Sequence, residues 1–300
     1  MGTSASYWVA SHLTGLFAIK DGNDEILSRG SIGAGVCINR GTVTTVTRTD
    51  HASLEVYFNG VKTPLSIATV TKRVLDLLFE RDSQQGIRIE HRFGIPISSG
   101  FGASAAGALG TAFAANDAFD LGFSRIRLFQ IAHLAEIYSN TGLGDIIGLY
   151  QGGAEVRIKQ GAPGVGQTIA MTNRDSWKIA TIHIGHLATP KILSDHRKRR
   201  AINLAGEQLI EKLISEPDFG NFVGLASQFS RKLNLWSKAL IGISELVPPE
   251  VVTAQIMLGD ALFLFYKPGT DLETLSNLDS SFKKETICQQ TVVRRESDAN

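Results

Sequence analysis

The chain has 300 residues, of which 43% are apolar and 20% charged, and its formal net charge is +1. This length and balance predict one large or two ordinary folded domains and exclude a disordered chain. The near-neutral charge gives no electrostatic reason to expect nucleic acid or an anionic membrane as a partner.

The first part of the chain predicts short strands. They share β-branched or aromatic residues bounded by Gly, Asn or Asp, and they lie at 7–9, 16–19, 35–38, 43–47 and 53–58. Apolar residues then recur at helical spacing over 66–79, where Ser66 is a suitable N-cap. A half-buried strand is expected over 86–93 and a helix over 124–139.

The second half predicts a strand at 154–158, followed by the polar passage KQGAPGVGQT. This passage is a candidate linker, and we divide the chain into domains at 1–172 and 173–300. The expected elements of the second domain are strands at 179–184 and 261–266 and helices at 195–215 and 219–233. The polar end, from residue 289 on, is expected to fray. The mixture of antiparallel strands and helices favours an α+β fold over a doubly wound sheet.

Two features indicate a cytoplasmic protein. Cys37 and Cys288 lie far apart and show neither metal-ligand spacing nor a disulfide pattern, which is typical of a reducing compartment. The moderately apolar N-terminus lacks a cationic start and is interrupted by His12 and Thr14, so we expect neither a signal peptide nor a membrane span.

A glycine-rich stretch, Gly100-Phe101-Gly102-Ala103-Ser104-Ala105, leads into an alanine-rich segment. It fits the dinucleotide pattern G-x-G-x-x-A, but Pro96 and two serines break the approaching strand that this pattern requires. The alanines alone fit a helix that packs closely against a neighbour. The glycines before them indicate that a ligand approaches the backbone. A helix beginning near Ser104 would offer free amides and the positive end of its dipole to a phosphate.

Without a lysine in this stretch, phosphate charge would have to be met by a metal ion and therefore by carboxylates elsewhere. Glu136 shares a helix face with His133, so it is either a buried structural group or a metal ligand. Asp145 follows two glycines before an apolar segment and is either an N-cap or a functional carboxylate.

The stretch 96–106 resembles the phosphate-binding motif P-x-x-x-G-L-G-S-S-A-A of the GHMP kinases, and the Ala-His-x-x-Glu pattern ending at Glu136 is similar to that superfamily too. Further stretches resemble its archaeal pantoate kinase branch: SHLTGLF, GSIGAGV, NTGLGDIIG, TPKILSDHRKRRAINLAG and MLGDALF. The chain departs from the superfamily in its first motif, which has Ala10-Ser11 in place of proline-glycine. The third motif is reduced to Met257–Asp260.

The resemblance implies a two-domain GHMP-kinase-like architecture, with mixed or antiparallel sheets and a nucleotide cleft between the domains. It implies ATP and Mg²⁺ as cofactors and phosphorylation of the primary hydroxyl of pantoate. Asp145 would take the hydroxyl proton, and Ser104 and Glu136 would hold the metal. The ATP phosphates would lie against Pro96, Ser98, Ser99, Gly100, Phe101, Gly102, Ala103, Ser104 and Ala105.

The acceptor site implied by the resemblance contains Ser11, His12, Thr14, Gly15, Ser31, Gly33, Arg157 and Gly259. The carboxylate of pantoate needs a cationic partner, and Arg157 and His12 are the candidates. The alternatives are a GHMP-type kinase for another small hydroxy acid, sugar or amino-acid alcohol, and a non-catalytic binding protein of this fold. We expect no nucleic acid or membrane partner, and a homodimer is possible.

Overall fold

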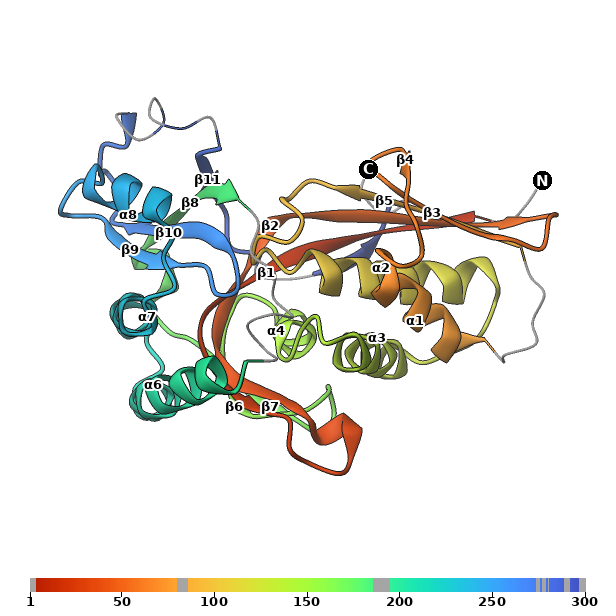
Figure 1. Ribbon diagram of the computed structural model, residues 1–300, viewed down its shortest axis with the longest axis horizontal. Helices are drawn as coiled ribbons and strands as arrows, with labels where there is room; N and C mark the ends of the chain where they lie inside the picture. Colours follow the sequence, from red (N-terminus) through yellow and green to blue (C-terminus); the bar gives the residue numbers. More distant parts are fainter. Residues whose placement is uncertain are drawn as a thin grey trace.

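Two long antiparallel strands form the centre of the protein. The computed structural model describes residues 4–79, 86–185, 195–273, 276, 279, 281–288 and 292–296. Strands β1 (Ser4–Lys20) and β2 (Gly30–Thr49) pair along their whole length, and β-bulges at Ala10/Ser11 and Thr14/Leu16 absorb the irregular places in β1. The predicted short strands at 7–9, 16–19, 35–38 and 43–47 are therefore parts of two continuous ones (Figure 1).

The first sheet has the order β12-β1-β2-β5-β3-β4, and β6 pairs with both β2 and β7. Its other strands are β3 (Leu54–Phe58), β4 (Val61–Lys62), β5 (Gly86–Phe93), β6 (Ala154–Lys159), β7 (Gln167–Ala170) and β12 (Val293–Arg295). All pairs are antiparallel except β3 with β5. This mixed sheet confirms the predicted α+β class.

Two sequence predictions about this sheet were wrong. The passage 159–168 is not a linker, because it connects the paired strands β6 and β7 as a hairpin and buries Ala162. Fraying was predicted from residue 289 on, but residues 293–295 pair with Tyr7–Val9 of β1. Residues 289–291 and 297–300 lie outside the described residues. The first segment is ordered in a local hairpin and the second by pairing with a strand far away in the sequence, and the composition of neither segment indicates this.

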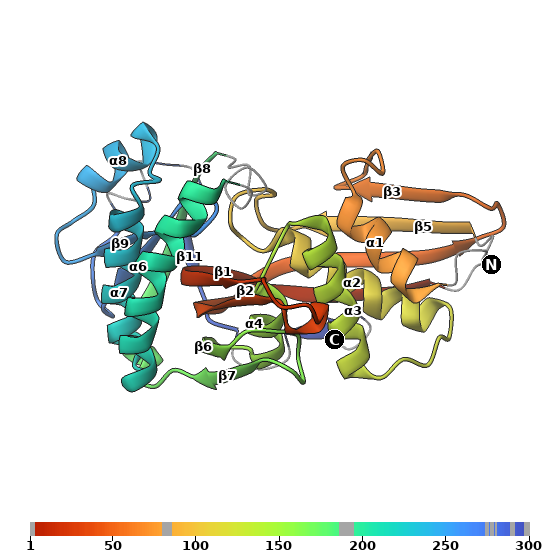
Figure 2. The same ribbon diagram turned by 60° about the horizontal axis from the view of Figure 1, so that its bottom comes forward.

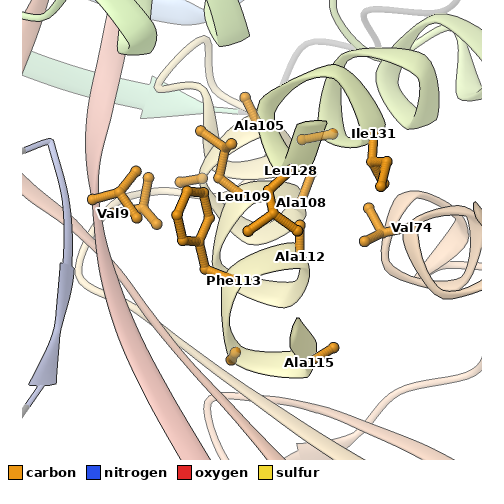
Figure 3. Packing of buried hydrophobic residues seen from close by; sticks show 14 of the residues in the cluster. Val9, Val74, Ala105, Ala108, Leu109, Ala112, Phe113, Ala115, Leu128 and Ile131 are labelled. Carbon is orange, nitrogen blue, oxygen red and sulfur yellow. The ribbon is translucent and has the colours of Figure 1, made fainter. Parts of the chain in front are cut away.

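Helices α1 (Thr69–Leu78), α2 (Ala103–Ala118), α3 (Arg125–Ser139) and α4 (Asp145–Gln151) cover one face of the first sheet (Figures 1 and 2). Small residues let α2 approach the sheet closely: a Cβ atom built on Gly110 would lie 2.4 Å from Thr44 Oγ1. Figure 3 shows the apolar core between α2, α3 and β1. The N-cap prediction for Ser66 was wrong, because α1 begins after Ala68, whereas α3 is capped by Ser124, whose side chain accepts a hydrogen bond from the Arg127 amide.

The second sheet has the order β11-β8-β10-β9 and is entirely antiparallel. Its elements are β8 (Lys178–Gly185), β9 (Val252–Gln255), β10 (Asp260–Tyr266) and β11 (Lys283–Glu285), with helices α6 (His196–Ser215), α7 (Phe219–Leu233) and α8 (Lys238–Glu245). One apolar cluster joins this part to the ends of the central strands, and in it Gly15 lies against Phe222. The division at 1–172 and 173–300 stays a prediction.

Among the helices of the described residues, none combines the length and apolar character that a membrane span requires. Cys37 and Cys288 are both buried, and within the described part of the chain neither forms a disulfide. The basic run from His196 to Arg200 forms the start of α6, where Arg199 pairs with Asp21 at 2.6 Å. Residues 189–194, the first part of one stretch that resembles the pantoate kinases, lie outside the described residues.

Candidate active site

A cavity of about 560 Å³ lies where the first sheet, the start of α2 and the second sheet meet. Its walls come from several parts of the chain. They include the central strands, strands β3 and β5, the start of α1, the loop before α2, the turn 141–145, and Met257 with Leu258 between β9 and β10. Segments far apart in the sequence therefore contribute to one cavity.

Residues 98–102 form a loop, the glycine loop, whose backbone takes left-handed conformations that favour glycine. Gly100 and Gly102 have φ values of +82° and +63°. A Cβ atom on Gly100 would lie 2.9 Å from Met257 O, so the second sheet presses directly on the loop. Gly102 is the N-cap of α2 and offers no side-chain cap, so the first amides of that helix face the cavity without a capping side chain.

Residues of β1, of β8 and of the turn between β9 and β10 contact the glycine loop. The hydroxyl of Ser11 donates a hydrogen bond to Phe101 O, and Ser99 Oγ lies 2.8 Å from His183 Nε2 on β8. A Cβ atom on Gly259 would lie 1.9 Å from Ser99 O. These residues position the loop, so Ser11 and Gly259 contact the loop rather than line the cavity.

Glu136 is buried beneath the start of α2. Its Oε2 accepts a hydrogen bond from Ser104 Oγ at 3.2 Å, and its Oε1 accepts one from Thr141 Oγ1 at 2.7 Å. Burial, together with the nearby charge of Asp145, raises the pKa of Glu136 to about 7. A Cβ atom on Gly142 would lie 2.1 Å from Glu136 Oε2 and 3.4 Å from Asp145 Oδ2, so both carboxylates face this turn.

The chemistry of these donors fits Mg²⁺. Two carboxylates that face one turn in a buried setting repel each other, and a divalent cation would relieve that repulsion. Mg²⁺ is typically bound through one or two carboxylates, with phosphates and water completing its shell. Within the described part of the chain, no group of three or more His, Cys, Asp or Glu residues could hold a metal alone. Glu136 and Ser104 would therefore bind the ion together with phosphate oxygens.

Asp145 is the first residue of α4 and lines the cavity with 23% of its side chain exposed. Its Oδ1 lies 2.7 Å from His12 Nδ1, and Thr14 also hydrogen-bonds to its side chain. Burial alone would raise the pKa of Asp145, but the hydrogen bond and charge of His12, with the charge of Arg157, lower it below its usual range. Asp145 is thus an ionised carboxylate in the cavity wall.

A buried network of charges lies behind Asp145. His12 Nε2 lies 3.2 Å from Glu155 Oε1, which also accepts a hydrogen bond from Arg157 Nη1 at 2.5 Å. Burial alone would lower the pKa of His12, but the carboxylates of Glu155 and Asp145 raise it to about 9. His12, Glu155 and Arg157 are all fully buried. His12 therefore contacts carboxylates of the protein and does not line the cavity.

Arg157 keeps unused hydrogen-bonding capacity. Its Nε and Nη2 atoms are buried and have no hydrogen-bond partner among the described residues. Cβ atoms built on the neighbouring glycines locate these atoms: one on Gly33 would lie 2.7 Å from Nη2, and one on Gly144 would lie 2.8 Å from Nε and 2.5 Å from Ser31 Oγ. Two donors of Arg157 thus lie next to Ser31 and Gly144 in the cavity wall.

The other end of the cavity is apolar and aromatic. Phe58, Ile67 and Phe93 line it together with His91, whose ring stacks on Phe93 with 5.5 Å between centroids. His91 hydrogen-bonds through Nδ1 to Thr44 and through Nε2 to Thr71, and burial lowers its pKa to about 3. This end is therefore uncharged, in contrast to the end that holds Asp145.

The structure brings the predicted site residues to different places. Those that line the cavity are Thr14, Ser31, Ser98, Ser99, Gly100, Phe101, Gly102, Ala103, Ser104 and Asp145. Those that do not line it are Pro96, Ala105, Glu136, Ser11, His12, Gly15, Gly33, Arg157 and Gly259.

Sequence reasoning missed Thr141, Glu155, His183 and the apolar end around His91. One signal was present, because Glu155 and Arg157 place opposite charges on one face of an otherwise apolar strand.

Known proteins match this chain along most of its length. Residues 69–153 match the GHMP kinases N terminal domain. The chain is 35% identical to the pantoate kinase of Thermococcus kodakarensis, with 85% of each protein covered. It is 30% identical to the pantoate kinase of Methanocaldococcus jannaschii, over 92% of this chain and 97% of that one. A solved structure described as "Phosphotransferase related to CoA biosynthesis pathway" is 29% identical, with a TM-score of 0.84 and coverage of 97% and 98%.

Proposed function

Since this chain belongs to the pantoate kinase branch of the GHMP kinase superfamily, we propose that it transfers the γ-phosphoryl group of ATP to the primary hydroxyl of pantoate. The product, 4-phosphopantoate, is an intermediate of coenzyme A synthesis. One observation carries the proposal: Asp145, the Ser104–Glu136 pair and the glycine loop meet around a single cavity.

ATP would lie along this cavity with its triphosphate on the glycine loop. The uncapped amides at the start of α2 suit phosphate oxygens, and the helix dipole favours their charge. The base would lie at the apolar end, where Phe58, Phe93 and the neutral His91 offer aromatic surface. Glu136 and Ser104 would hold Mg²⁺. When bound, the ion supplies positive charge that stabilises the transferring phosphoryl group.

Pantoate would bind between Arg157 and Asp145. The free Nε and Nη2 donors of Arg157 can grip its carboxylate in the two-pronged geometry that arginine favours, with Ser31 beside them. Its primary hydroxyl would then face Asp145. The hydroxyl oxygen bonds to the γ-phosphorus as the bond to the β–γ bridging oxygen breaks. Asp145 takes the proton as this attack proceeds, because a carboxylate of low pKa is too weak a base to remove it earlier.

A kinase assay with a panel of acceptors tests this function. Pure protein with ATP and Mg²⁺ is offered pantoate, homoserine, mevalonate and other small hydroxy acids, and kcat/KM is compared. Pantoate should be the best acceptor. A large preference for another alcohol would reject pantoate but not the kinase, and no transfer to any acceptor would favour a binding protein.

The variant Asp145→Asn tests the proposed base. It should lower kcat at least about a hundredfold while ATP affinity stays within about twofold, because the carboxylate acts only on the acceptor proton. Unchanged turnover would return Asp145 to a structural role at the start of α4.

We further propose that the enzyme acts in the cytoplasm and can form a homodimer. Cell fractionation would test the first proposal and light scattering the second.

A further inference from the structure

His12 is enclosed on every side by the protein. It lies on β1 between the two bulges and is fully buried. Cβ atoms built on Gly35 and Gly148 would lie 2.6 Å and 2.5 Å from its Nε2, so the ring fills a slot between β2 and α4 that only glycines leave open. In this slot the ring cannot turn toward the cavity.

Both ring nitrogens of His12 are used. Nδ1 lies 2.7 Å from Asp145 Oδ1 and Nε2 lies 3.2 Å from Glu155 Oε1. Between two ionised carboxylates, which can only accept hydrogen bonds, both nitrogens carry a proton and the ring is an imidazolium. Arg157 Nη1, which lies 3.4 Å from Nε2, then donates to Glu155 Oε1 at 2.5 Å rather than to the ring. The raised pKa of His12, about 9, agrees with this. With Arg157 beside Glu155, the buried group contains two positive and two negative charges.

Asp145 depends on this partner for its orientation. It follows the turn Gly142-Leu143-Gly144, which provides no side-chain cap, so its carboxylate is held by hydrogen bonds from His12 and Thr14 on β1. His12 holds Oδ1, and the other oxygen, Oδ2, lies toward Gly142 and the Ser104–Glu136 side of the cavity. The oxygen that His12 does not hold is therefore the one on the side where the phosphates are proposed to bind.

Resting on the phosphoryl transfer proposed above, we propose that His12 is a positioning residue. It fixes Asp145 through Nδ1 so that Oδ2 meets the acceptor hydroxyl, and Glu155 fixes His12 through Nε2. His12 thus acts through Asp145 and contacts neither ATP nor pantoate.

A double-mutant cycle tests this role. The variants His12→Gln, Asp145→Asn and the combination of both are compared with the wild type in kcat, KM for pantoate and affinity for an ATP analogue. His12→Gln alone should lower kcat about tenfold to a hundredfold with analogue affinity unchanged, because the reacting carboxylate loses its orientation. In the Asp145→Asn background the same change should lower kcat less than about threefold, because the two residues act as a unit.

Two kinetic outcomes would overturn the proposal. One is that His12→Gln lowers kcat by the same factor in the wild type and in the Asp145→Asn variant, as a merely structural role would produce. The other is a raised KM for pantoate with unchanged kcat, which would make His12 a substrate ligand. If His12→Gln fails to fold, Glu155→Gln replaces it in the cycle, and the same outcomes apply with a smaller expected loss.

A measurement without substrate separates this inference from the proposed function. In ¹⁵N-histidine-labelled protein at neutral pH, both ring nitrogens of His12, assigned by comparison with His12→Gln, should carry protons. A ring without a proton on Nδ1 would overturn the positioning role even if pantoate is phosphorylated, because it could not donate a hydrogen bond to Asp145. If the ring is doubly protonated but the protein does not phosphorylate pantoate, the hydrogen bond between His12 and Asp145 stands. Only the proposal that pantoate is the acceptor is then rejected.

Discussion

Replacement of Glu136 by glutamine should stabilise the metal-free protein. The pKa of Glu136 is raised from 4.5 to about 7, so the fold favours its protonated form. This difference corresponds to roughly 3 kcal/mol against the ionised form at pH well above 7. Glutamine keeps the shape and can still pair with the hydroxyls of Ser104 and Thr141. We expect Glu136→Gln to raise the free energy of unfolding by about 2–3 kcal/mol at pH 8 without metal.

The raised pKa of Glu136 determines how the effect of Glu136→Gln on the free energy of unfolding changes with pH. A carboxyl with a raised folded pKa contributes stability that is fully present below its unfolded value of 4.5 and is lost as pH rises through about 7. The gain from Glu136→Gln should therefore be small at pH 5 and largest near pH 8. Urea unfolding in the presence of a chelator, followed by tryptophan fluorescence, measures it at each pH.

Two comparisons sharpen the test. With Mg²⁺ and an ATP analogue, the wild type should gain stability by mass action and Glu136→Gln should gain much less. The matched variant Glu155→Gln changes an equally buried carboxylate that is paired with Arg157 and His12, so it should destabilise the protein instead. A loss of stability in Glu136→Gln at pH 8, or a gain that does not change between pH 5 and 8, would refute the reasoning.

The remaining predictions concern the acceptor and the glycine loop. Arg157→Lys should raise KM for pantoate about tenfold or more and leave KM for ATP unchanged in steady-state kinetics, because lysine cannot supply two parallel donors; an effect confined to ATP would contradict the acceptor role. Gly259→Ala should weaken binding of an ATP analogue about tenfold in calorimetry, because its Cβ would lie 1.9 Å from Ser99 O and must displace the loop. Unchanged affinity would mean that the turn at Gly259 shifts instead.

The parts of the site that follow from local sequence were predictable. The glycine loop, the start of α2 and the positions of Glu136 and Asp145 depend on residues close together in the chain, and the structure places these groups around one cavity. Helix caps such as Ser124 are also local, since the capping hydroxyl lies within one turn of the amide it accepts from.

The partners of these residues could not be predicted because pairing between distant strands creates them. Glu155 meets His12 only because β6 pairs with β2 beside β1. His183 reaches the glycine loop only because the second sheet packs against it. Periodicity assigns such residues to strands, but register decides which side chains meet. The continuous length of β1 was not predicted either. Polar residues interrupt its apolar pattern close to its two β-bulges, and pairing with β2 continues through these irregularities.

The pairing of strand β12 with strand β1 has a consequence for biosynthesis. Val293 to Arg295 pair with β1, and the amide of Ala10, two residues before His12, donates to Val292 O. The strand that carries the start of the active site is therefore completed by residues that leave the ribosome after every other described strand has been synthesised. A nascent chain or a C-terminally shortened protein would expose one side of β1, and we expect such forms to bind chaperones or self-associate before they acquire activity.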